Sequence, residues 1–332
     1  MFPPTTTTPV TTTTATPSVN LSAVGDIELG NSPQLPSDAN SYFGPVRAAL
    51  AAPIVFGNLE GTMTTSSSSK CTKTSTQCYA FRVPPSYATI YRNAGFTILN
   101  AANNHSFDFG SVGAADTTAA LRSAGIVQAG LPGEIGVVRD GKLKVAFVDF
   151  APYANTNNLL DFSTAAELIA RAKTLANLVV VYMHAGAEGS SADHVTRASE
   201  TFAGENRGNP FAFAHAAIDD GADLVIASGP HVLRGMEFYN GHLIDYSLGD
   251  FTNYENFSAG GDLNLSGILH VTLSDAGAFV SGRFTSVILQ SFGQAFVDPS
   301  GAAATFVNQL SKDDFGSSAA VISSSGAITP LP

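Results

Sequence analysis

The sequence predicts one α/β domain of four layers, in the order α–β–β–α, with two mixed sheets in the middle. From residue 20 onward, short β-branched runs alternate with amphipathic stretches, which is typical of α/β proteins. After residue 231 the pattern changes to pairs of antiparallel strands. No Pro/Gly/Ser-rich linker divides the middle of the chain, so a single domain accommodates both patterns better than two domains.

Five apolar runs are predicted to form strands in the first part of the domain. They cover residues 21–24, 54–56, 97–99, 178–182 and 224–227. The helical spacing of apolar residues predicts helices at residues 46–51, 87–94, 114–124, 165–175 and 211–220. Two of the strands follow a helix through an Ala-Gly or Asp-Gly-Ala turn, which ends a helix before a strand begins.

Two antiparallel pairs are expected in the second part of the domain. Asn240-Gly241 tolerates positive φ at both central positions of a primed turn, which predicts a hairpin between residues 236–239 and 242–247. Residues 266–273 and 278–289 are expected to form the second pair.

Both ends of the chain have a biased composition. The first residues are almost entirely Thr and Pro, so they cannot bury a core and are expected to form an extended tether. From about residue 316 the chain is rich in Ser, Gly and Ala, which predicts weak order. We therefore expect a tether at residues 1–19, a domain at residues 20–315 and a weakly ordered tail at residues 316–332.

The Thr/Pro segment and the cysteines indicate an extracytoplasmic protein, at the cell surface or secreted. The segment lacks the basic and apolar regions of a signal peptide, so we expect an export signal upstream of it; a disordered cytosolic tail is the alternative. Cys71 and Cys78 bracket a polar loop at a spacing that is not usual for a zinc knuckle. A disulfide between them is favoured over two free thiols, which agrees with export.

Charge and hydropathy exclude several classes of partner. The net charge of −11 argues against nucleic acid or an anionic membrane surface as the main partner. No segment has the roughly 18 consecutive apolar residues of a transmembrane helix.

Polar residues of metal-binding type follow all five predicted strands. They lie in five short segments: Gly25-Asp26-Ile27-Glu28, Gly57-Asn58-Leu59-Glu60, Asn103-Asn104-His105, Met183-His184-Ala185-Gly186 and Gly229-Pro230-His231. Ligands gather at the carboxyl ends of strands in α/β sheets, because the loops converge there. Each segment alone is compatible with an ordinary turn, cap or loop, whereas the set of five indicates a metal-dependent hydrolase.

The residue types suggest individual roles at this site. Asp26 offers a carboxylate, Glu60 could bridge two ions, Asn104 supplies a carbonyl oxygen, and His184 and His231 supply imidazoles suited to Zn, Mn or Fe. Two divalent ions would clamp a phosphate-like group and activate water.

Two further residues have the chemistry of an acid–base pair. His105 would stabilise developing charge or protonate a leaving oxygen. Asp108 would then hold the imidazole of His105 in one orientation.

The series of motifs resembles a known family. The segments GDIELG, FGNLEGTM, LNAANNHSFDFG, YMHAGAEG and ADLVIASGPHVLRGMEFYNGHLIDYSLGDF are similar to those of the bacterial capsule-synthesis family of the CapA type. That family is associated with poly-γ-glutamate production and lies within the calcineurin-like metallophosphoesterase superfamily. The resemblance covers about residues 20–255 and implies a metallophosphoesterase-like αββα fold, a metal centre and an extracytoplasmic location.

The resemblance assigns roles to individual residues. Asp26 matches the first metal-binding Asp, and Asn58-Leu59-Glu60 matches the family's NLE, where phosphoesterases have a bridging Asp. Asn104 and His105 match the Asn ligand and the catalytic His, while His184 and His231 match the later histidine ligands. Asn58 is thereby a further candidate ligand.

Three departures from the pattern bear on the metal count. Glu28 stands where phosphoesterases have a His, and it could substitute as a ligand. Ser228 and Gly229 precede Pro230-His231 where more histidine is usual, and Asp250 replaces Asn in the family's SLGNF. One or two divalent ions (Mn, Zn or Fe) are therefore expected, and whether the site is catalytic stays open.

Two classes of function follow. The first is a metal-dependent hydrolase acting on a phosphoester or an anionic polymer, linked to the synthesis or processing of poly-γ-glutamate or another capsule polymer. The second is a non-catalytic binding or scaffolding subunit of a capsule-synthesis membrane complex, or a surface assembly protein.

Overall fold

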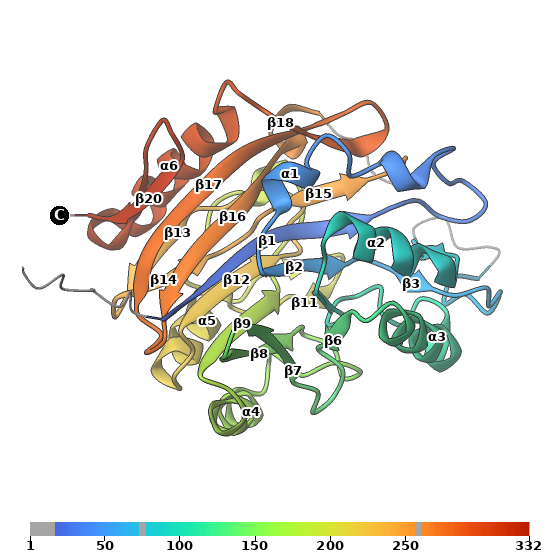
Figure 1. Cartoon of the computed structure of the whole chain (residues 1–332), viewed down its shortest axis with the longest axis horizontal. Coiled ribbons are helices and arrows are strands. Elements are labelled where there is room, and N and C mark those ends of the chain that lie inside the picture. Colours follow the sequence, from blue (N-terminus) through green and yellow to red (C-terminus); the bar gives the residue numbers. More distant parts are fainter. Residues whose placement is uncertain (1–16, 73–77, 256–259, 332) are drawn as a thin grey trace, which may run out of the picture.

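Two β-sheets pack face to face, with helices on their outer faces (Figure 1). The computed structural model describes residues 17–72, 78–255 and 260–331, so most of the predicted tether lies outside the described residues. The predicted four-layer α/β architecture with two mixed sheets is confirmed.

The larger sheet has ten strands and is parallel on one side and antiparallel on the other. Its main path runs β19-β20-β17-β16-β1-β2-β5-β6, with β15 paired to β1 and β18 paired to β17. The strands are β1 (Ser18–Glu28), β2 (Ile54–Leu59), β5 (Ile98–Asn100), β6 (Val127–Ala129), β15 (Asp250–Asn253), β16 (Leu265–Ser274), β17 (Phe279–Gln290), β18 (Gln294–Val297), β19 (Ala320–Ile322) and β20 (Ala327–Pro330).

The smaller sheet has six strands in the order β13-β14-β12-β9-β8-β7. They are β7 (Gly136–Asp140), β8 (Leu143–Phe150), β9 (Leu178–His184), β12 (Leu224–Ser228), β13 (Met236–Tyr239) and β14 (His242–Asp245). The predicted hairpin is confirmed: β13 and β14 pair antiparallel, and Asn240 and Gly241 have φ of 50° and 84°.

Aromatic rings from both sheets meet in the middle layer of the core. Phe56 on β2 stacks on Phe147 of β8, with ring centroids 5.1 Å apart, and lies 5.2 Å from Tyr182 of β9. Side chains of a strand point alternately to its two faces, so β2 and β9 present every second residue to this layer. Burial of these large rings, which are fully excluded from solvent, holds the sheets at a fixed separation.

Helices cover the two outer faces. Helices α2 (Ala88–Ala94) and α3 (Gly110–Ser123) pack on the larger sheet, while α4 (Phe162–Leu175) and α5 (Pro210–Asp219) pack on the smaller one. Further elements are α1 (Arg47–Leu50), α6 (Ala302–Phe315) and two short strand pairs, β3 (Thr62–Met63) with β4 (Arg82–Val83) and β10 (Thr201–Phe202) with β11 (Glu205–Asn206), besides short 3-10 helices.

Local sequence explains where two of the helices begin. The side chain of Asp161 accepts a hydrogen bond from the backbone N–H of Thr164 and so caps α4. Asn209 caps α5 in the same way through the N–H of Ala212, with Pro210 at the first helical position.

The chain end corrects the prediction of a weakly ordered tail. Residues 320–322 and 327–330 form β19 and β20, and β20 pairs with β17 of the larger sheet. The reason is that Ala320, Ile322 and Ile328 join the core between the sheets, although Ser and Gly surround them in sequence. At the other end β1 begins at Ser18, two residues inside the predicted tether.

A carboxyl group is buried within the middle layer beside these rings. Asp149 lies on β8 opposite Tyr182 of β9, it is fully buried, and neither carboxyl oxygen has a hydrogen-bond partner among the described residues. Burial raises the pKa of Asp149 well above its ordinary value, and the charge of Glu134 adds to this rise. Sequence patterns did not single out this residue, because one Asp within an apolar run leaves the strand pattern intact.

The Ile328→Ala variant tests the role of the chain end. Ile328 is 2% exposed, so its truncation leaves a cavity in the core and is expected to cost about 2–4 kcal/mol of unfolding free energy. Leu331→Ala is the control, because Leu331 is 40% exposed and should cost less than about 0.5 kcal/mol. Equal urea midpoints for the two variants would contradict this role.

The Asp149→Asn variant is expected to stabilise the protein at pH 7. Because the folded-state pKa is raised, the unfolded chain loses this proton first. The contribution of Asp149 to the free energy of unfolding is therefore fully present below its unfolded-state pKa of about 4, and it is lost as the pH rises towards the folded-state pKa. Asn cannot ionise, so the gain in melting temperature over the parent should grow between pH 4 and pH 7. A gain that stays constant over this interval would refute the prediction.

Candidate metal centre

The carboxyl ends of strands from both sheets meet at one edge of the domain. Asp26 lies on β1 and Asn58 on β2 of the larger sheet, while His184 and Ser228 end β9 and β12 of the smaller sheet. Glu60 follows β2 directly. The structure therefore brings together segments that the sequence places at separate strand ends.

Asp26, Glu60 and His184 form a group with the spacing of a ligand shell. Nδ1 of His184 lies 3.9 Å from Asp26 Oδ1 and 3.8 Å from Glu60 Oε2. All three side chains are buried, and Glu60 Oε1 has no hydrogen-bond partner among the described residues. Asn104 Oδ1 is likewise buried without a partner in the described part of the chain. Carboxylate, imidazole and amide oxygen donors in this state suit a divalent cation.

A second group, Asp26, His231 and Asp250, is closed by hydrogen bonds. Nδ1 of His231 lies 2.7 Å from Asp250 Oδ1 and 3.2 Å from Asp26 Oδ2. At these distances Nδ1 carries a hydrogen towards the carboxylates instead of a lone pair towards an ion. His231, predicted as a metal ligand, thus lies beside Asp26 and Asp250, and its Nδ1 acts as a hydrogen-bond donor to them.

The two residues that replace the expected histidine hold Asp26 instead. The hydroxyl of Ser228 donates to Asp26 Oδ1, and the backbone N–H of Gly229 donates to Oδ2 at 3.2 Å. Each oxygen of Asp26 thus accepts a hydrogen bond from this segment.

The orientation of the Asn58 amide is fixed by two neighbouring amides. Asn100 Oδ1 accepts from the N–H of Ala102, so its Nδ2 must be the atom that donates to Asn58 Oδ1 at 2.6 Å. Asn103 Nδ2 donates to the carbonyl of Leu59 and also to Asn58 Oδ1, at 2.8 Å. Since both neighbours present N–H groups, the atom of Asn58 that faces them is its oxygen.

Asn58 consequently turns its N–H₂ group towards the ligand carboxylates. Nδ2 donates to Asp26 Oδ1 at 2.6 Å and to Glu60 Oε2 at 2.5 Å. The candidate role of Asn58 as an oxygen ligand is not supported, because its oxygen is already satisfied by two amides. Asn58 instead positions the two carboxylates, as residues behind metal ligands commonly do.

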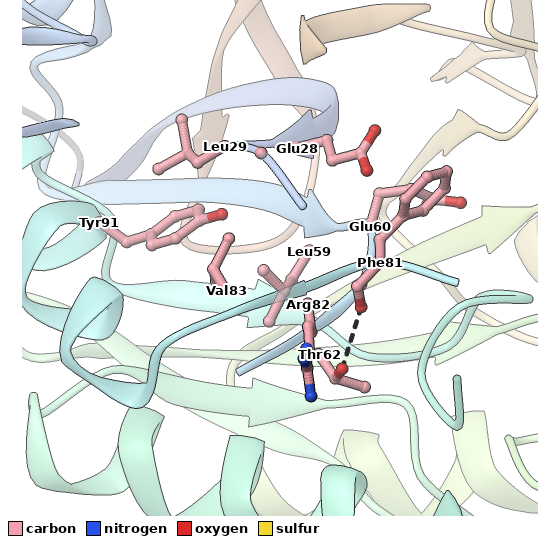
Figure 2. Close-up of a pocket in the computed structure, with 11 residues that line it drawn as sticks. Glu28, Leu29, Leu59, Glu60, Thr62, Phe81, Arg82, Val83 and Tyr91 are labelled. Carbon is pink, nitrogen blue, oxygen red and sulfur yellow. Dashed lines mark hydrogen bonds between the residues drawn. The ribbon is translucent and has the colours of Figure 1, made fainter. Parts of the chain in front are cut away.

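Glu28, the candidate for the place of the histidine ligand, lies in neither of these two groups. Its buried side chain instead lines a small cavity beside Glu60, Phe81 and Tyr91 (Figure 2).

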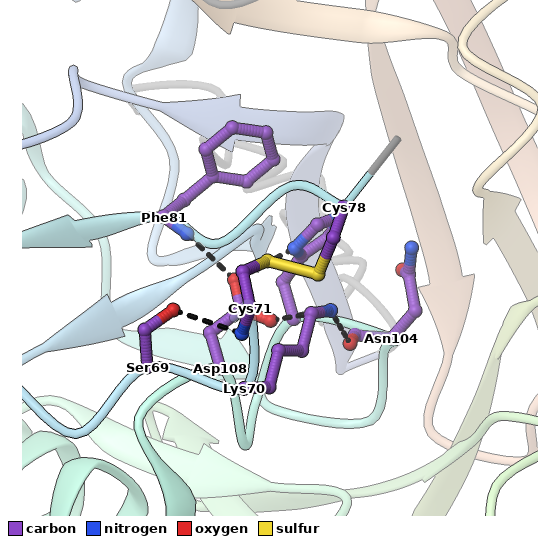
Figure 3. Close-up of a disulfide and its surroundings, with 8 residues drawn as sticks. Ser69, Lys70, Cys71, Cys78, Phe81, Asn104 and Asp108 are labelled. Atoms are coloured by element: carbon purple, nitrogen blue, oxygen red, sulfur yellow. Dashed lines mark hydrogen bonds and ion pairs between the residues drawn. A yellow bond between two sulfur atoms is a disulfide. The ribbon is translucent and has the colours of Figure 1, made fainter. Parts of the chain in front are cut away.

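The two members of the predicted acid–base pair are in contact. His105 Nδ1 lies 2.7 Å from Asp108 Oδ2, and His105 Nε2 faces Glu60 Oε1 at 3.7 Å. Asp108 is fully buried, and it also receives the backbone N–H of Phe81 and the ammonium of Lys70, each at 2.6 Å (Figure 3). These contacts fix the carboxylate, which in turn fixes the imidazole.

The predicted disulfide between Cys71 and Cys78 is present, and it connects the two segments that hold Asp108 (Figure 3). Lys70 precedes the first cysteine, and Phe81 follows the second by three residues. Residues 73–77 lie outside the described residues. The disulfide thus supports the contact between His105 and Asp108 from the surface side.

Burial and charge set the protonation of the first group. Burial, reinforced by the charge of Asp26, raises the pKa of Glu60 well above its ordinary value. Burial lowers the pKa of His184 to about 3. Burial thus favours the protonated form of Glu60 and the neutral form of His184, so a cation that binds here competes with the proton of Glu60.

Asp26 and His231 form an ion pair within the second group. Burial alone would raise the pKa of Asp26, but the hydrogen bond and charge of His231 outweigh it and lower the value to about 2. Burial would lower the pKa of His231, but Asp250 and Asp26 together raise it well above its ordinary value.

Replacement of both cysteines by serine tests the disulfide. The two cysteines are seven residues apart, and the closure entropy of such a loop corresponds to about 2–3 kcal/mol of unfolding free energy. We expect a loss of this size in urea denaturation, together with faster hydrogen exchange at the N–H of Phe81. Unchanged exchange at Phe81 would show that the disulfide does not support the contact with Asp108.

Curated relatives of the chain carry capsule-biosynthesis names. The PGA biosynthesis protein CapA of Bacillus subtilis (strain 168) is 30% identical over 259 residues, which is 70% of this chain and 63% of that protein. The capsule biosynthesis protein CapA of Bacillus anthracis is 30% identical over 182 residues, which is 48% of this chain and 41% of that protein. The chain thus spans less than two thirds of the length of either relative.

Solved structures with a similar chain path are more distant. A 5′-nucleotidase precursor from Thermus thermophilus is 13% identical, with a TM-score of 0.44 over 82% of this chain and 54% of that chain. A purple acid phosphatase from yellow lupin seeds is 9% identical, with a TM-score of 0.39 over 85% of this chain and 53% of that chain.

A family model matches most of the domain, from residue 20 to residue 255. Among the described residues, no helix is long and apolar enough to cross a membrane. The chain belongs to the bacterial capsule synthesis protein PGA_cap family.

Proposed function

We propose that this protein is an extracytoplasmic, metal-dependent hydrolase that acts on an anionic capsule polymer of the poly-γ-glutamate type or on a phosphoester. The observation that carries the proposal is the buried group of Asp26, Glu60 and His184, which faces the His105–Asp108 pair through Glu60. Ligand atoms and an acid–base pair at the same strand ends are the parts that a hydrolytic centre needs.

Asp26, Glu60 and His184 would hold one divalent cation, with the carbonyl oxygen of Asn104 as a further donor. The chemistry that such a cation supplies is polarisation of the scissile ester or amide group as a Lewis acid. Asn58 holds the two carboxylates in place by donating to Asp26 Oδ1 and Glu60 Oε2.

His105 would move the proton. Burial lowers the pKa of His105, so the imidazole is neutral near pH 7. Its Nδ1–H points at Asp108, which places the lone pair on Nε2, the atom that faces Glu60. In this tautomer His105 first accepts a proton from water and then returns it to the leaving oxygen or nitrogen.

The proposed location outside the cytoplasm rests on the disulfide and on the capsule-biosynthesis names of the relatives. Work at the site of polymer export would place the protein beside a capsule-synthesis membrane complex, which we propose as its partner.

One observation favours the second candidate function, a polymer-binding or scaffolding subunit without turnover. The group of Asp26, His231 and Asp250 is satisfied by hydrogen bonds, so a two-ion centre would require these contacts to break. A centre with one cation lacks the second ion that would help to clamp and activate a phosphate-like group, which favours binding over turnover.

Metal analysis combined with hydrolysis assays tests the proposal. We expect the purified protein to hold about one divalent ion per chain and to cleave poly-γ-glutamate or a chromogenic phosphodiester in the presence of Mn²⁺. His184→Ala should lose the ion, since it removes one of the three ligands. His105→Ala should keep the ion and lose about 10²-fold or more in rate, the typical contribution of an acid–base residue.

His194→Ala is the matched control, because its side chain is 56% exposed, pairs with Asp314 of α6 and belongs to neither candidate ligand group. Its metal content and rate should equal those of the parent. Bound metal without turnover on either substrate would favour the scaffolding function, and absence of metal from the parent would refute the ligand assignment.

A further inference from the structure

A buried arginine stands beside the centre in the loop that joins β9 to α5. Arg207 follows β11 (Figure 1), and its side chain is only 5% exposed. Its backbone is fixed, because its N–H donates to Glu200 and its carbonyl accepts the N–H of Gly186 at 3.0 Å. Gly186 follows His184 by two residues, so Arg207 is tied to the segment that carries a candidate ligand.

Carboxylates and aromatic rings surround the Arg207 guanidinium. Its NH1 atom lies 2.8 Å from Glu188 Oε1, and its Nε atom lies 3.2 Å from Glu205 Oε2. The rings of Phe202 and Tyr153 lie 5.5 Å and 6.0 Å from the guanidinium carbon. A planar guanidinium between aromatic faces keeps its fork of N–H donors in one orientation, which suits the recognition of a carboxylate.

Glu188 lies between this arginine and the centre. Its Oε1 contacts Arg207, while its Oε2 lies 3.8 Å from Nε2 of His231. The other ring nitrogen of His231 contacts Asp26. A chain of three contacts therefore leads from Asp26 through His231 and Glu188 to Arg207. The carboxylate of Glu188 lies between the imidazole of His231 and the guanidinium of Arg207.

We infer that Arg207 is a binding residue for a carboxylate of an acidic polymer, and that Glu188 fills this place until the polymer displaces it. The group that now occupies the place is itself the side-chain carboxylate of a glutamate. The inference rests on the proposed function for the choice of substrate, and it deepens that function by naming the group that the centre recognises.

Charge explains why such a residue is needed. The chain carries 27 acidic and 16 basic residues, so a polyanion is repelled by the protein as a whole. A buried guanidinium attracts an anion more strongly than an exposed one, because water screens it less. When a substrate carboxylate replaces that of Glu188, one ion pair with Arg207 is exchanged for another. The guanidinium therefore keeps a carboxylate partner throughout.

Binding of a short γ-glutamyl oligomer, measured by calorimetry with the full chain in EDTA, tests the inference without any hydrolysis. Arg207→Gln should weaken binding about 10-fold to 100-fold, because a charge-assisted hydrogen bond contributes about 1.5–3 kcal/mol. Glu188→Gln should tighten binding, since it removes the competing carboxylate. Arg139→Gln on β7 is the control, because it makes the same change of charge at an exposed position.

The outcomes separate this inference from the proposed function. Equal affinities of Arg207→Gln and Arg139→Gln, or unchanged affinity of Glu188→Gln, would overturn it. Binding of inorganic phosphate that depends on Arg207, without binding of the oligomer, would overturn the carboxylate assignment. Binding that depends on Arg207, in a protein that holds no metal and shows no turnover, would support this inference and refute the proposed hydrolase function.

Two further measurements guard against misfolding of the variant. Arg207→Lys keeps the charge but loses the fork, so we expect affinity between those of the parent and Arg207→Gln. Circular dichroism and melting temperature identify a folded variant. If neither substitution at Arg207 folds, the affinity of Glu188→Gln decides, because this substitution replaces the carboxylate by an amide of the same shape.

Discussion

The buried carboxylate of Asp26 ties the two sheets together at the candidate site. Asn58 on β2 and Ser228 on β12 donate to one of its oxygens, while Gly229 and His231 reach the other. Because β2 belongs to the larger sheet and β12 to the smaller, a single charge fixes the carboxyl ends of both. A buried charge is tolerated only when such donors compensate for the lost water, so the positions of the surrounding residues depend on this group.

The same hydrogen bonds make the centre asymmetric. On the side of Glu60 and His184 the ligand atoms stand 3.8–3.9 Å apart, which leaves room for a cation. On the side of His231 and Asp250 the atoms are in direct hydrogen-bond contact. Ser228 acts directly on the shared carboxylate, because its hydroxyl takes up a lone pair of Asp26.

Two loops from separate parts of the chain each place a cationic side chain beside this acidic centre. Lys70, next to the disulfide, holds Asp108 and thereby His105. Arg207, in the loop after β9, accepts a backbone hydrogen bond from Gly186, and its guanidinium contacts Glu188. Backbone hydrogen bonds hold the segments that carry Lys70 and Arg207. Both side chains therefore contact the neighbouring carboxylates in a fixed geometry.

Sequence by itself determined the layered α/β fold, the hairpin at Asn240-Gly241, the disulfide and the residue types at the strand ends, because local periodicity and turn chemistry encode them. It misjudged the chain end, where a few apolar residues within a Ser/Gly-rich stretch complete the core. Only the tertiary structure decided that Asn58 donates hydrogens, that Glu28 lies outside the ligand groups, that Asp250 joins one of them and that Arg207 contacts Glu188. The physical reason is that the orientation of an amide or a carboxylate is set by partners from distant strands, which no local pattern contains.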